Sequence, residues 1–143
     1  MLRVISFKLF IKFLLIFLTL IDIFLIIMGL VFPAVWLKWI HGVYVPDHQG
    51  LMIYIGGIWL AFASLQILAT ILWENHVYWL AVIAGVRWTE SCAGWLQLMA
   101  ANDLSAFGKI FLASVPAANL VFGYILIRCY QELRTFDLRE KPL

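Results

Sequence analysis

Two full charges, Arg87 and Glu90, stand inside an apolar stretch of the chain. The residues around them, from 77 to 100, are otherwise apolar, small or weakly polar. A guanidinium and a carboxylate three residues apart share one face of a helix and can form an ion pair. Asp22 and Asn119 occur in two other apolar stretches. These four side chains are the candidates for chemistry, provided that the fold brings them together.

The composition is that of an integral membrane protein. Hydrophobic residues make up 65% of the 143 residues and charged residues 13%, and the mean hydropathy is +1.00. Soluble domains have about 45–50% apolar and about 25% charged residues. The chain is therefore expected to lie almost wholly in a lipid bilayer.

Four apolar segments are each long enough for a helix across a hydrocarbon core of about 30 Å. They cover residues 10–35, 51–72, 77–100 and 107–129, followed by a polar tail, 130–143. Only helices and closed barrels satisfy their backbone in lipid, and continuous apolar runs are not typical of barrel strands. The sequence thus predicts an all-α membrane protein, a compact up-down bundle of four transmembrane helices that forms one domain, 1–143.

The basic residues predict the orientation, because cytoplasmic flanks carry an excess of lysine and arginine. The first and third connections hold only Lys38 and Lys109. The terminal segments are richer, with Arg3, Lys8, Lys12, Arg128, Arg134, Arg139 and Lys141. Both termini are therefore expected in the cytoplasm, with the chain in a bacterial inner membrane, cytoplasmic or intracytoplasmic. This charge is explained by topology, and nothing favours a nucleic-acid partner.

Depth within the bilayer predicts that the four candidates form one polar layer. A rise of 1.5 Å per residue puts Asp22 about 18 Å along the first helix, and Arg87 and Glu90 about 15 and 20 Å along the third. The fourth helix runs the opposite way and puts Asn119 about 18 Å from its outer end. Four positions on three helices thus fall at one level.

Helical spacing predicts that this layer faces the interior of the bundle. Inward stripes with a three-and-four repeat contain the candidates. Small residues in these stripes, among them Gly29, Gly94 and Gly123, are expected to let the helices approach closely. The same is expected of three pairs, Gly57 with Ala61, Ala81 with Gly85, and Ala113 with Ala117. An unpaired charge at the bilayer centre is costly, so Arg87 should pair with Asp22, Glu90 or both.

The layer so drawn holds two carboxylates against one guanidinium, which leaves one excess negative charge. Either one acid is protonated or another cation reaches the site. One interpretation is a structural clasp that fixes the helix register, with Asn119 completing its hydrogen bonds. The other is a proton, cation or ligand site, because a buried carboxylic acid can hold and exchange a proton.

Other candidate chemistry is sparse. His41, Asp47 and His48 fall in the outer connection and form a weak candidate set for zinc, copper or iron. A polar loop with exposed histidines is the simpler interpretation. No catalytic residue and no cofactor motif is identified, although contacts with lipid or pigment are compatible with the composition.

The general plan of the chain resembles the small DoxX-like membrane proteins in length, helix count and glycine placement. In this plan the first segment closes with GLVFPAVWL (29–37) and the second opens with GLMIYIGGIWL (50–60). The resemblance covers most of the chain. It implies a compact four-helix bundle, in some cases attached to quinone-linked redox systems. The pair Arg87 and Glu90 has no match in that family's pattern, and no functional residue is carried over.

Three functions are compatible with these observations. The favoured one is a non-catalytic accessory subunit of a larger membrane complex, of the energy-converting or light-harvesting type, in contact with lipids and other membrane subunits. The many aromatic residues favour large helix–helix contacts. The alternatives are a small proton, ion or solute transporter that uses the charged layer, and a quinone-linked redox component whose redox centre a partner would supply.

Overall fold

The computed structural model describes residues 2–44 and 50–140, and every regular element in them is helical. In chain order these are α1 (Leu2–Ile26), the π-helical segment η1 (Ile27–Val31), α2 (Pro33–His41), α3 (Leu51–Leu72), α4 (Tyr78–Ala100) and α5 (Ala106–Glu140). The predicted all-α class is therefore confirmed for this part of the chain.

Among the described residues, three helical stretches are long and apolar enough to cross a membrane. They are Ser6–Val31, Leu51–Leu72 and Ala106–Phe136, and they indicate an integral membrane protein. The helix α4 has 23 residues but is less apolar than these three, because it carries Arg87 and Glu90 in its middle.

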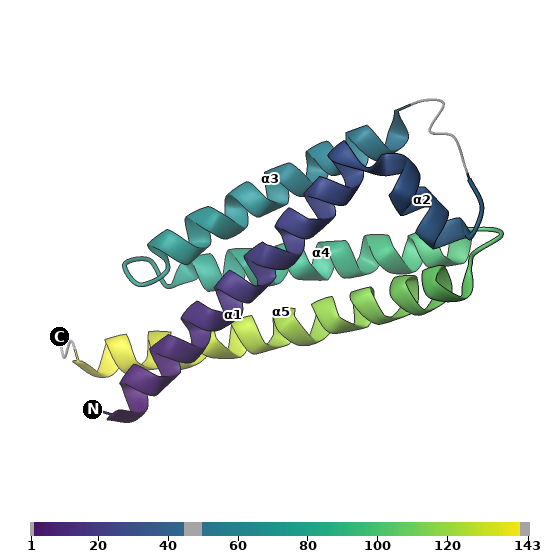
Figure 1. The fold of residues 1–143 in the computed structure, drawn as a ribbon. Coiled ribbons are helices and arrows are strands. Elements are labelled where there is room, and N and C mark those ends of the chain that lie inside the picture. Colours follow the sequence, from purple (N-terminus) through teal and green to yellow (C-terminus); the bar gives the residue numbers. More distant parts are fainter. Residues whose placement is uncertain (1, 45–49, 141–143) are drawn as a thin grey trace.

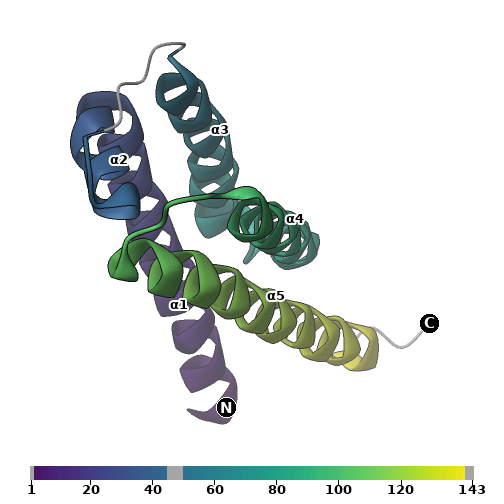
Figure 2. The same ribbon diagram turned by 90° about the vertical axis from the view of Figure 1, so that its right-hand side faces the viewer.

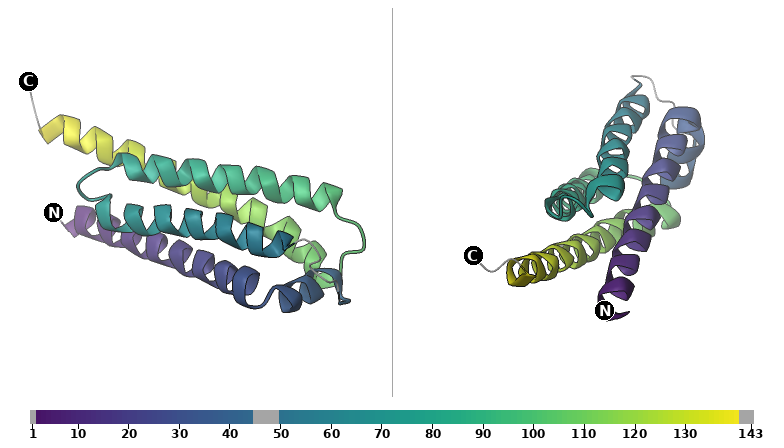
Figure 3. Two further views of the ribbon diagram at one scale, coloured as in Figure 1. Left: turned by 90° about the horizontal axis from the view of Figure 1, so that it is seen from above. Right: turned by 90° about the vertical axis from the view of Figure 1, so that its left-hand side faces the viewer.

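The long helices run side by side with alternating direction (Figure 1). The start of α1, the end of α5 and the α3–α4 connection lie at one end of the molecule, here called the terminal end. The helix α2 and the α4–α5 connection lie at the other, here called the α2 end. The end-on view in Figure 2 shows α1 crossing α5 obliquely. Two pairs make the most extensive contacts, α4 with α5 and α1 with α3 (Figure 3).

The first helix differs from the prediction of one continuous segment over 10–35. It starts at Leu2 and breaks after Val31, and α2 then runs in a new direction. Proline has no N–H and its ring clashes with the preceding turn, so Pro33 starts a helix rather than continuing one. Phe32 leaves the helical region (φ −125°, ψ 46°), and its N–H donates to the carbonyl of Ile27 at 3.2 Å, which closes the π turn.

The last helix also differs from its prediction. The segments predicted over 51–72 and 77–100 agree with α3 and α4, but α5 does not end near residue 129. It continues to Glu140, so most of the predicted tail is helical. Gln131, Glu132 and Arg134 are good helix formers, and a helix that satisfies its own backbone can extend beyond the apolar core.

Close helix contacts form at the glycines of the predicted inward stripes but not at the predicted small-residue pairs. No atom outside the local helix lies within 4 Å of a Cβ built at Gly57 or Gly85, and Ala117 is exposed. The predicted small-residue contacts at these positions are therefore wrong within this chain. The expectation for the stripes is confirmed at three glycines, with Gly29 against Gly56 and Trp59, Gly94 against Pro116, and Gly123 against Trp88. A further close contact joins Gly108 to Ile40.

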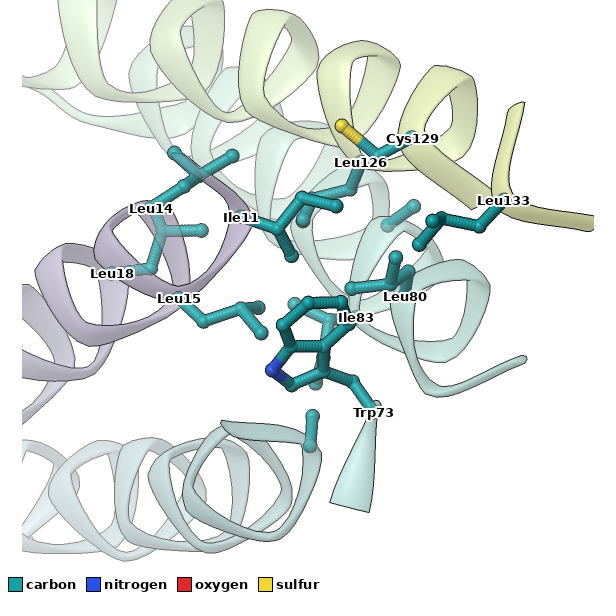
Figure 4. Close-up of a cluster of buried hydrophobic side chains, with 12 residues drawn as sticks. Ile11, Leu14, Leu15, Leu18, Trp73, Leu80, Ile83, Leu126, Cys129 and Leu133 are labelled. Atoms are coloured by element: carbon teal, nitrogen blue, oxygen red, sulfur yellow. The ribbon is translucent and has the colours of Figure 1, made fainter. Parts of the chain in front are cut away.

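Two separate apolar clusters fill the interior. The terminal-end cluster is largely aliphatic and comes from α1, α3, α4 and α5 (Figure 4): Ile11, Leu14, Leu15, Leu18, Ala69, Trp73, Leu80, Ile83, Ala84, Leu126, Cys129 and Leu133. The α2-end cluster comprises Leu25, Met28, Trp36, Ile40, Met52 and Leu112. Along α1, α3 and α5 the buried polar residues fall between the members of the two clusters. A polar layer thus separates two apolar regions.

Candidate functional site

The centre of the polar layer is an ion pair between α1 and α4. The guanidinium of Arg87 donates two parallel hydrogen bonds to Asp22, Nη1 to Oδ1 at 2.8 Å and Nη2 to Oδ2 at 2.6 Å. Both residues are only 2% exposed. This two-pronged geometry is the strongest way for arginine to bind a carboxylate. The predicted buried salt bridge is therefore confirmed.

Arg87 also contacts Glu90 on its own helix and Gln66 on α3. Its Nη1 donates to Glu90 Oε2 at 2.9 Å and its Nη2 to Gln66 Oε1 at 3.1 Å. Gln66 is 1% exposed, and its Nε2 donates weakly, at 3.4 Å, to the carbonyl of Leu15 on α1. One guanidinium thus holds together three helices.

The fourth long helix joins the layer through weaker contacts. Asn119 on α5 is buried, and its Nδ2 lies 3.5 Å from Glu90 Oε2, at the limit of a hydrogen bond. A shorter bond runs from Ser91 Oγ to the carbonyl of Pro116 at 2.8 Å. All four predicted layer residues therefore lie close together, with Asn119 at the edge.

The electrostatic balance of this layer is uneven. Asp22 Oδ1 and Glu90 Oε2 accept hydrogen bonds from the same nitrogen of Arg87, so the two carboxylates share one cation. Four of the five N–H donors of the guanidinium are used. The fifth, on Nε, is buried and has no partner among the described residues. The geometry suits a clasp between helices or a site that holds a proton.

Of the three candidate metal ligands, only His41 is among the described residues. Asp47 and His48 lie outside the described residues. His41 ends α2, where its Nδ1 lies 3.4 Å from the carbonyl oxygen of Asp103. Among the described residues, no group of three histidine, cysteine, aspartate or glutamate side chains is close enough to hold a metal ion.

Sequence reasoning missed Gln66. The spacing was a signal, because Gly56, Ala63 and Gln66 follow the same three-and-four helical repeat as the other inward stripes. In the structure all three residues are buried. However, α3 has no charged residue to mark the level of the layer, and the depth of Gln66 was not compared with that of the charges as the depth of Asn119 was. The layer thus has one more helix than the sequence indicated.

No protein-family model matches the chain, and neither a curated protein nor a solved structure matches it significantly. The geometry of the layer and the surface of the helices are therefore the basis for the function proposed below.

Proposed function

We propose that the chain is a non-catalytic accessory subunit of a larger membrane complex, of the energy-converting or light-harvesting type. In this role the charged layer is a clasp that fixes the relative positions of the helices. The outer surface then packs against partner helices, lipid or pigment.

The main support for this proposal is that the charged layer is buried inside the protein. Asp22, Gln66 and Arg87 bind one another across three helices and are each at most 2% exposed. Apolar clusters lie on both sides of them along the helices. Side chains that hydrogen-bond one another and are shielded from water are suited to stabilising a fold rather than to binding a substrate.

The outer surface supports the same role. Large apolar side chains are exposed along all the long helices, for example Phe13 (64%), Ile71 (66%), Leu96 (63%) and Ile110 (69%). Polar side chains on these faces, such as Ser64 and Thr89, donate to carbonyls of their own helices. Such a surface is complementary to lipid and to other transmembrane helices.

In this proposal α4 crosses the membrane as the fourth helix of an up-down bundle. Its connections to α3 and α5 lie at opposite ends of the molecule, and 23 residues span about 35 Å. The terminal end faces the cytoplasm of a bacterial inner membrane, because the exposed Lys8 and Lys12 of α1 and Arg128 and Arg134 of α5 lie there. Labelling of single cysteines introduced at each end tests this orientation.

Solubilisation in mild detergent tests the accessory role. The tagged chain is expected to migrate with a larger assembly, and its partners and pigments can then be identified. Leucine substituted in turn for Gly57, Gly85 and Ala117 provides the sharper test, because these positions face outward. At least one variant should leave the assembly while remaining folded. A chain that migrates alone in the native membrane extract contradicts the proposal.

A small proton or ion transporter is the second candidate, and the excess carboxylate of the layer favours it. Flux into liposomes containing only this chain, abolished by Glu90→Gln, would establish this function in place of the accessory role.

A further inference from the structure

The buried layer has more negative than positive groups. Its charged members among the described residues are Asp22 from α1 and Arg87 and Glu90 from α4. The groups that face them from the other two long helices are the neutral amides of Gln66 and Asn119. An uncompensated charge deep in a membrane protein is costly, so the layer needs one more positive charge.

The contacts of the two carboxylates are unequal. Asp22 binds Arg87 through both oxygens, at 2.8 and 2.6 Å, and its side chain is 2% exposed. Glu90 binds Arg87 through Oε2 alone, at 2.9 Å, and its side chain is 10% exposed. The negative charge is therefore best stabilised on Asp22, which leaves Glu90 as the acid that can be neutral.

We propose that Glu90 carries one exchangeable proton in the folded protein, so that the layer is a proton-binding site beside a fixed ion pair of Asp22 and Arg87. On uptake an O–H bond of a hydronium ion breaks as the O–H bond of the Glu90 carboxyl group forms, and on release the carboxyl O–H bond breaks and the proton returns to water. This site does not depend on a partner complex, and the accessory role can fail without affecting it.

The face of α4 that carries Glu90 also indicates the route of exchange. Toward the α2 end, Ala93 and Gln97 follow Glu90 by three and seven residues, so they share its face, and both are exposed. Toward the terminal end, Arg87 and Ile83 occupy the same face and are 2% and 0% exposed. Glu90 is therefore less enclosed toward the α2 end than toward the terminal end, and the proposed proton exchange takes place from the α2 end.

Infrared difference spectroscopy of the full chain in lipid tests where the proton resides. The wild type is expected to show a carboxylic-acid C=O band that is lost in Glu90→Gln and shifted in Glu90→Asp. Glutamine mimics the neutral acid, so Glu90→Gln is expected to fold. A band that persists in Glu90→Gln overturns the proposal, and so does loss of the fold in that variant.

Transfer into heavy water tests the route. Ala93→Leu is expected to slow the deuterium shift of the Glu90 band, because the larger side chain covers the exposed strip. Cys92→Leu is the matched control, since Cys92 is exposed on the opposite face of α4, and it should leave the rate unchanged. Equal rates in both variants and the wild type overturn the route from the α2 end.

Discussion

The two apolar clusters on either side of the charged layer are built in different ways. The terminal-end cluster consists mostly of leucine, isoleucine and alanine on uninterrupted helices. The α2-end cluster depends on a break in the first helix and on aromatic rings around Trp36. Ring centroids of Phe24, Trp39, Trp59 and Phe111 lie 6.5, 6.4, 6.3 and 5.1 Å from that of Trp36.

The difference shows where single residues matter. A cluster formed by the repeating apolar face of several helices contains many equivalent positions. The effect of one substitution is therefore spread over its neighbours. The α2 end instead depends on particular residues: Pro33 starts α2, Gly56 admits η1, and Ser105 joins α2 to α5. Local changes should therefore loosen the α2 end alone, whereas changes in the layer should affect both ends.

The largest expected effect comes from removing one partner of the central pair. Asp22→Leu leaves the guanidinium of Arg87 buried without its main acceptor, and breaking a buried pair in this way costs about 3–5 kcal/mol. The free energy of unfolding, measured by denaturant titration in micelles, should fall by this amount. Amide hydrogen exchange should rise at both ends. A rise in amide exchange at one end only would contradict the expectation that changes in the layer affect both ends.

A smaller effect is expected from filling the close contact at the α2 end. A Cβ at Gly56 would lie 2.7 Å from Leu30 Cδ2 and 3.2 Å from the backbone of Gly29. Overpacking of this kind costs about 1–3 kcal/mol, so Gly56→Leu should destabilise the protein and increase exchange in η1 and α2.

The matched control for this variant is the next residue. Gly57→Leu meets open space, and leucine has the higher helix propensity, so the free energy of unfolding of the isolated chain should not fall. If both variants lost the same free energy of unfolding, the close contact between η1 and α3 would not be located at Gly56.

The smallest effect is expected at the link between α2 and α5. Ser105 Oγ accepts from the N–H of Gly108 at 2.9 Å, as an N-cap of α5, and donates to the carbonyl of Trp39 at 2.6 Å. Loss of such a cap costs about 1 kcal/mol, so Ser105→Ala should raise amide exchange in α2 and in the first turn of α5 only. Ser114→Ala is the control, because Ser114 bonds only within α5. Increased exchange at the terminal end in Ser105→Ala would count against the separation of the two ends.

The central pair was predictable because full charges in apolar helices are rare and costly. Depth and helical spacing alone placed Asp22 and Arg87 at one level and on inward faces, and the structure brings them into contact. Two of the long helices, α3 and α4, were predictable to the same degree, since the length of each segment gives its approximate bounds. The sequence does not show whether Gly56 or Gly57 faces a neighbouring helix, because that depends on which helices pair.

The features that sequence reasoning missed leave weak signals in composition. The break after Val31 is as apolar as the helix before it, and only Pro33 marks it. The extension of α5 to Glu140 is polar, and a criterion based on membrane thickness ends the helix too early. Gln66 lies on α3, a helix without a charged residue to mark the level of the layer, although it accepts a hydrogen bond from Arg87.

A double-variant comparison tests the clasp between Asp22 and Arg87 most directly. The free energy of unfolding is measured for Asp22→Leu, Arg87→Met and the two combined, in the same micelles. Each single variant is expected to lose about 3–5 kcal/mol, and the double variant much less than the sum, because removing both partners leaves neither charge of the pair buried alone and the protonated Glu90 adds none. Losses that simply add would mean that the two side chains do not hold α1 and α4 together, and would contradict the account.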